Sequence, residues 1–168
     1  MGSTEAKAGL QAFLKQNKKF LEKNDYSTFQ KILEYADNNQ LEHIKSAIEA
    51  LYSLGKANTP KDKDILRKGI QLSYLLLESL AEEQMTPKLQ QALAALQSIL
   101  PKLAASGVKR ADIRTFENIV RLAKHGKSKA ETIKALLQSK EIIMHEEYSG
   151  NQTFQEALAL GKNILNQL

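Results

Sequence analysis

The chain has 168 residues, no cysteine, no tryptophan and a formal net charge of +5. A chain of this length buries roughly 70% of the surface that its unfolded form exposes, so one domain with a full hydrophobic core is expected. The absence of cysteine excludes disulfide frameworks, thiolate zinc sites and cysteine nucleophiles.

The apolar residues are mainly Leu, Ile and Ala, which favours helices over strands. No apolar run approaches the roughly 20 residues that a membrane-spanning helix needs, so we expect no membrane span. The lack of cysteine and of a signal peptide favours a reducing compartment, and we expect a cytoplasmic protein. Residues 1–3 resemble a cloning remnant, which leaves residues 4–168 as a single all-helical domain.

Helix-start signals recur along the chain, ahead of apolar residues at helical spacing. Thr59-Pro60 and Thr86-Pro87 each place a capping hydroxyl before a proline at the first helical position. Capping boxes are predicted at Ser27–Gln30, Ser128–Glu131 and Thr153–Glu156. The predicted helices run from residue 5 to 23, from 25 or 27 through 33, from 40 to 54, from 60 to 83, from 87 to 100, from 110 to 124, from 128 to 143 and from 153 to 165.

The predicted helix over residues 60–83 is apolar almost all round its middle, which is typical of a central helix. Pro101 is expected to kink or end the fifth helix, because proline has no backbone donor. Short connections favour antiparallel neighbours. We therefore predict an all-α fold, a compact bundle of about eight helices arranged as antiparallel hairpins around the helix at 60–83.

The positive charge is concentrated in one part of the chain. Residues 101–140 hold ten basic and three acidic residues, whereas residues 141–168 hold one basic and four acidic residues. Such a segment is either the footprint of an anionic partner or one half of a pair of helices that neutralise each other within the fold.

Three of the four arginines, Arg110, Arg114 and Arg121, lie in the predicted helix over 110–124. At about 100° per residue they fall within a sector of about 40°, and Lys124 lies close beside it. The apolar residues of the helix centre roughly 140° away, so the arginines should face solvent. We call Arg110, Arg114 and Arg121 the arginine face.

Arginine can grip a phosphate or a carboxylate with two hydrogen bonds, which lysine cannot do. Two other interpretations remain open. Glu117 lies about 20° outside the sector and could pair with Arg114 and Arg121, or the helix could dock against the acidic stretch that holds Glu141, Glu146 and Glu147.

Catalytic and cofactor motifs are not found. Gly126-Lys127-Ser128 ends like a phosphate-binding loop, but the first glycine is missing and no strand precedes it. A helix-turn-helix register around Gly126 fails, because polar residues fall where apolar ones belong. Arg121 and His125 resemble the Arg–His pair of the HEPN ribonucleases, but their spacing is too short for that family. We predict no metal site, since Glu141 and His145 form one unmatched pair.

We therefore predict a non-enzymatic helical interaction or adaptor module whose arginine-rich helix face contacts a macromolecular partner, a protein in the first place. The alternative is a sequence-tolerant nucleic-acid-binding subunit that contacts the phosphate backbone, and the third class is a helical nuclease or another enzyme. No catalytic residue, metal or cofactor is assigned. The predicted contact residues are Arg110, Arg114, Arg121, Lys124, Lys109, Lys127 and Lys129.

Overall fold

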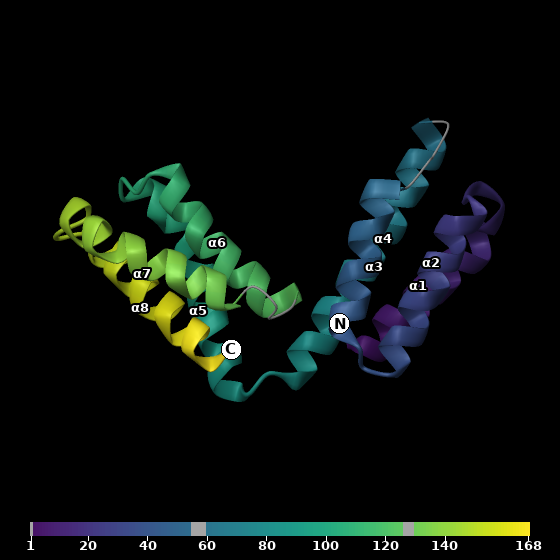
Figure 1. Cartoon of the computed structure of the whole chain (residues 1–168), viewed down its shortest axis with the longest axis horizontal. Coiled ribbons are helices and arrows are strands. Elements are labelled where there is room, and N and C mark those ends of the chain that lie inside the picture. The colour runs from purple at the N-terminus through teal and green to yellow at the C-terminus, as the bar shows by residue number, and fades with distance from the viewer. Residues whose placement is uncertain (1, 55–59, 126–129) are drawn as a thin grey trace. The chain divides into compact units, whose positions relative to one another are not determined.

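The computed structural model describes residues 2–54, 60–125 and 130–168 (Figure 1). All regular structure in these ranges is helical, with eight α-helices and one short 3-10 helix. The predicted all-α class with about eight helices is confirmed. Contacts divide the chain into two units, unit 1 from Met1 to Gln84 and unit 2 from Met85 to Leu168. Each unit has a hydrophobic core of its own. That the two units form a single domain stays a prediction.

Each unit contains four of the α-helices (Figure 1). Those of unit 1 are α1 (Ser3–Asn17), α2 (Lys23–Asp37), α3 (Leu41–Leu54) and α4 (Pro60–Gln84), with the 3-10 helix η1 (Lys18–Phe20) after α1. Those of unit 2 are α5 (Pro87–Ala105), α6 (Arg110–His125), α7 (Ala130–Glu147) and α8 (Gln152–Gln167).

In unit 1, α4 is the central helix and contacts α1, α2 and α3. Phe13 of α1 and Phe29 of α2 meet edge to face beside it, with ring centroids 6.0 Å apart and ring planes at 72°. Gly69 of α4 lies against both rings, since a Cβ at this position would stand 2.6 Å from Phe29 Cζ and 2.7 Å from Phe13 Cε1. The missing side chain therefore lets α4 approach the phenylalanine pair. The expected central position of this helix holds within unit 1, because the core of unit 2 contains no α4 residue.

In unit 2, α5 packs against α8 and α6, α6 packs against α8, and α7 contacts both α6 and α8. Phe116 of α6 and Phe154 of α8 meet edge to face, with ring centroids 5.8 Å apart and ring planes at 70°. Gly161 of α8 lies against α6, since a Cβ there would stand 3.1 Å from Ile119 Cδ1 and 3.5 Å from Phe116 Cδ1. Each unit thus sets a glycine of its fourth α-helix against a phenylalanine of its second.

Several predicted helix ends are corrected by the structure. Helix α1 ends at Asn17, whose side-chain amide donates to the Phe13 carbonyl at 2.9 Å, and not at residue 23. Helix α2 already begins at Lys23, so Ser27 lies inside the helix and does not cap it. Pro101 does not end α5, which continues to Ala105, because the exposed proline ring removes one backbone donor on the solvent side only.

Two N-caps are resolved in unit 2. The Thr86 hydroxyl accepts from the Leu89 amide at 3.1 Å, as the Thr86-Pro87 motif predicts. Helix α8 begins at Gln152, because Asn151 Oδ1 accepts from the Phe154 amide at 3.0 Å. The predicted cap at Thr153 is therefore wrong, while the predicted box at Ser128 lies outside the described residues.

Ser3 begins α1, although the sequence assigns it to a cloning remnant. Its backbone amide and its hydroxyl donate to the two carboxylate oxygens of Glu83, at 3.0 Å and 2.9 Å. These hydrogen bonds lower the pKa of the Glu83 carboxyl. Ser3 therefore joins the start of α1 to the end of α4.

Candidate interaction surface

Helix α6 is divided into a buried and an exposed side. Its buried residues are Asp112, Ile113, Thr115, Phe116, Ile119, Val120, Leu122 and Ala123. All three residues of the arginine face lie on the exposed side. The helix begins at Arg110 and ends at His125, close to the predicted range. The surrounding fold therefore presents the arginine face to solvent within unit 2.

None of the three arginines forms an ion pair with any residue that the structure describes. Glu117, which lies between Arg114 and Arg121 on the same side of α6, is half-buried and is likewise unpaired within the described ranges. The pairing of Glu117 with its neighbours that the sequence left open is not formed. The charges of this face are therefore not neutralised by one another.

Two carboxylates of the acidic stretch after α6, Glu141 and Glu147, bind other residues. Glu141 of α7 accepts a hydrogen bond from Lys162 of α8 and lies 3.6 Å from His145 Nε2, and the Lys162 hydrogen bond is the main reason why the pKa of Glu141 is lowered. Glu147 pairs with Lys109, just before α6. These carboxylates thus hold α7 to the rest of unit 2 and do not cover the arginine face.

The four lysines predicted beside the arginines differ in their surroundings. The ammonium of Lys109 is paired with Glu147, whose hydrogen bond and charge raise the lysine pKa. Lys124 is half-buried in the last turn of α6. Lys127 and Lys129 lie outside the described residues. The structure therefore leaves the arginines as the best-defined part of the predicted contact set.

A hydrogen-bonded tyrosine ties the end of α7 to the start of α6. The Tyr148 hydroxyl donates to the buried carboxylate of Asp112 and accepts from the Lys109 amide at 3.0 Å. Burial, followed by the hydrogen bond to Asp112, raises the pKa of Tyr148 to about 12. Sequence reasoning missed this contact, because a pairing of residues from two different helices leaves no local pattern. Its role is structural, since it orients the helix that carries the arginine face.

The second helices of the two units carry the same buried pattern. Five residues recur with identical spacing, namely Asp25, Thr28, Phe29, Ile32 and Ala36 in α2, and Asp112, Thr115, Phe116, Ile119 and Ala123 in α6. The threonine hydroxyl donates to the backbone carbonyl four residues earlier in both helices, at 2.9 Å in α2 and 3.4 Å in α6. The two phenylalanines are the fully buried rings that meet the glycines described above. The local packing of α2 and α6 is therefore alike.

The exposed sides of the same two helices differ. Where α6 carries Arg110, Arg114, Glu117, Arg121 and Lys124, α2 carries Lys23, Ser27, Gln30, Glu34 and Asp37 at the matching positions. One of these, Asp37, pairs with Lys7 of α1. The arginine face is therefore a property of unit 2 and is not required by the buried pattern that both helices share.

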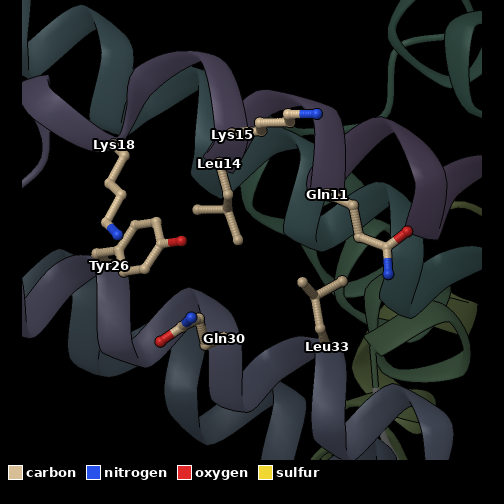
Figure 2. A pocket seen from close by; sticks show the side chains of 7 residues that line it. All are labelled: Gln11, Leu14, Lys15, Lys18, Tyr26, Gln30 and Leu33. Atoms are coloured by element: carbon tan, nitrogen blue, oxygen red, sulfur yellow. The ribbon is translucent and has the colours of Figure 1, made fainter.

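Unit 1 has an open cleft of about 350 Å³ between α1 and α2 (Figure 2). Leu14 and Leu33 extend into it from opposite helices, and the Tyr26 hydroxyl points into the space between them (Figure 2). The Lys18 ammonium lies 5.3 Å from the centre of the Tyr26 ring. In α6 the residues at the positions of Tyr26 and Leu33 are buried, so the cleft belongs to unit 1. Its lining combines aliphatic, aromatic, amide and basic groups.

Helix α7 exposes apolar side chains. Ile142 and Ile143 are 72% and 66% exposed, and Leu136 is also exposed. Only part of α7 enters the core, through Leu137 and Met144. The exposed set adds an apolar area to the surface of unit 2.

Among the described residues, no three His, Cys, Asp or Glu side chains cluster as metal ligands do. Over the same residues, no helix is both long enough and apolar enough to cross a membrane. Comparison with protein-family models, with curated proteins and with solved structures finds no match for this chain.

Proposed function

We propose that the protein is a non-enzymatic helical interaction module whose arginine face on α6 binds an acidic macromolecule, in the first place a protein. The observation that carries the proposal is the set of three exposed arginines without an ion pair in the described structure. Two lysines of unit 2, Lys109 and Lys162, do have carboxylate partners. The fourth arginine, Arg67, pairs with Asp64, so among the described residues the guanidinium groups without an ion pair all lie on α6.

The spacing of the three arginines along α6 suits a contact with an elongated partner segment. At about 1.5 Å per residue, Arg110 and Arg121 lie roughly 16 Å apart along α6. A charge-assisted hydrogen bond contributes about 1.5–3 kcal/mol, and a planar guanidinium can form two of them to one carboxylate. Several such contacts along one helix would support specific binding by a partner with acidic side chains in a row.

The nucleic-acid alternative relies on the same arginines. Proteins that bind single strands usually stack bases on exposed aromatic rings. The aromatic residue of α6, Phe116, is fully buried, so this helix offers charge without a stacking surface. Binding of nucleic acid here would be to phosphates alone, and its affinity would fall steeply with salt.

The test exchanges the arginine face for the residues that α2 carries. The variant Arg110→Lys, Arg114→Ser, Arg121→Glu is titrated against a synthetic helical acidic peptide and against a short double-stranded DNA, with fluorescence anisotropy at several salt concentrations. The matched control, Lys88→Ser with Lys102→Glu, changes exposed residues of α5 and lowers the net charge by the same amount.

We expect the exchange to weaken peptide binding at least about tenfold, which corresponds to 1.4 kcal/mol, and the control to leave it nearly unchanged. Equal weakening by both variants would show that only net charge matters and would contradict the proposal. Binding of the DNA alone, with a steep salt slope, would favour the nucleic-acid alternative.

A further inference from the structure

We propose that the partner of the arginine face is an acidic helix that carries one basic residue opposite Glu117. This inference rests on the proposed function and names the chemistry of the partner. Along the exposed side of α6 the charges follow the order positive, positive, negative, positive, positive. The residues in that order are Arg110, Arg114, Glu117, Arg121 and Lys124.

The position of Glu117 disfavours a continuous polyanion. Arg114 and Arg121 are about 10 Å apart along the helix, and Glu117 lies between them. The screening length in physiological salt is about 8 Å, so a phosphate chain that joined the two arginines would be repelled by the carboxylate. A partner with separate charged side chains can contact both arginines and place a positive group at the acid.

Glu117 also has no ion-pair partner among the described residues. It is half-buried, and neither Arg114 nor Arg121 lies within ion-pairing distance of it. A cation from a bound molecule would supply the ion pair that Glu117 lacks among the described residues. The acid therefore favours a matched partner and disfavours an all-acidic one, which is how charge patterns produce specificity.

Comparison with unit 1 shows that the packing of this helix does not require a glutamate at the position of Glu117. The shared buried pattern of α2 and α6 is compatible with Gln30 at the position of Glu117, and with Glu34 at the position of Arg121. Glu117 and the arginines therefore differ together from their counterparts in unit 1. The order positive, positive, negative, positive, positive, which the matching positions of α2 lack, is the feature that a partner would recognise.

A helix is the occupant that fits the spacing. The charged residues of α6 follow steps of three or four residues along a single side of the helix. A second helix lying along α6 repeats side chains at the same intervals, whereas an extended strand presents one side chain to a given side about every 6.6 Å. The partner helix would place acids at the arginines and a lysine or arginine at Glu117.

The experiment compares two synthetic helical peptides that differ at one position. Both carry acidic residues at helical spacing on one side, and the central residue is lysine in one and glutamate in the other. Each is titrated against the full chain, Glu117→Gln and Glu117→Lys by fluorescence anisotropy, and a short double-stranded DNA serves as a third probe. Thermal unfolding followed by circular dichroism checks that the variants are folded.

We expect the unmodified chain to bind the lysine peptide about tenfold more tightly than the glutamate peptide, equal to 1.4 kcal/mol. Glu117→Gln should reduce this preference, and Glu117→Lys should invert it and strengthen DNA binding. Tighter binding of the glutamate peptide or of DNA to the unmodified chain would overturn the inference and leave the proposed function standing. If neither peptide binds, or if the α2-type exchange leaves binding intact, the proposed function itself fails.

Discussion

The second helices of the two units separate what packing requires from what the surface is free to vary. Helices α2 and α6 share five buried or half-buried residues at the same spacing, yet their exposed positions differ in charge. The shared phenylalanines, Phe29 and Phe116, each pair with a second phenylalanine and lie against the glycine of the fourth helix of their unit. The comparison teaches that a helix of this kind can be built without an arginine face. The arginines of α6 therefore call for an explanation outside the fold.

The largest expected effect comes from removing the matched phenylalanines. Phe29 and Phe116 are fully buried, so replacing either by alanine should lower the free energy of unfolding by about 3–5 kcal/mol. Because each unit has its own core, Phe29→Ala should speed amide hydrogen exchange in unit 1 and Phe116→Ala in unit 2. Mass spectrometry of the exchanged peptides checks this. Equal loosening of both units by either variant would show one cooperative domain.

The glycines of the fourth helices should respond differently from a solvent-exposed glycine. A Cβ at Gly69 would lie under 3 Å from two phenylalanine rings, so Gly69→Ala should destabilise the protein by about 1–3 kcal/mol. Gly161→Ala should cost less, because its nearest contact would be 3.1 Å. The control Gly9→Ala, in α1 with nothing within 4 Å, should stabilise by about 0.5–1 kcal/mol. Urea unfolding measures all three, and a Gly69→Ala protein as stable as Gly9→Ala would contradict the packing described for α4.

The tyrosine contact distinguishes unit 2 from unit 1. Tyr148→Phe leaves the Asp112 carboxylate and the Lys109 amide without their partner, so the free energy of unfolding should fall by about 1–3 kcal/mol. In α2 no tyrosine hydroxyl donates to the buried Asp25 in the part of the chain that the structure describes, and burial raises the pKa of the Asp25 carboxyl. Chemical denaturation of Tyr148→Phe beside the unmodified chain measures the difference.

The same tyrosine predicts a loss of stability at high pH. Its pKa is 10.0 when unperturbed and about 12 in the fold, so the folded state disfavours ionisation. The stabilisation is fully present below pH 10 and is lost as the pH rises towards 12. Unfolding temperatures recorded across this window should fall less steeply in Tyr148→Phe, and parallel curves would contradict the role given to the buried hydroxyl.

Local signals in the sequence predict much of this fold. Helix α6 follows the predicted range because apolar and charged residues recur at helical spacing along its whole length. Thr86 caps α5, as the Thr86-Pro87 motif predicts. Pro101 misled the prediction, because a proline on the exposed side of a helix that is held by its buried side removes only one hydrogen bond. Asn151 competes successfully with Thr153 as a cap, which the capping pattern alone does not reveal.

Long-range features were not predictable in the same way. The division into two cores depends on which helices meet, and the pairing of Tyr148 with Asp112 joins residues of different helices. The likeness of α2 and α6 involves few residues, and their phenylalanines meet partners from different helices, Phe13 of α1 and Phe154 of α8. The arginine face itself was predictable from the sequence, because helical spacing alone places its three arginines on one side of the helix. Only the structure shows that these arginines form no ion pair with the described residues.

The most direct test of the account is a residue-by-residue map of amide chemical shifts, recorded by NMR while the lysine-centred acidic peptide is added to the full chain. We predict that the largest shifts fall on the exposed side of α6, around Arg114, Glu117 and Arg121. The matching positions of α2 should move little, since they lack the arginines. Shifts centred on α2, or on the cleft lined by Tyr26 and Leu33, would contradict the claim that the arginine face is the binding surface.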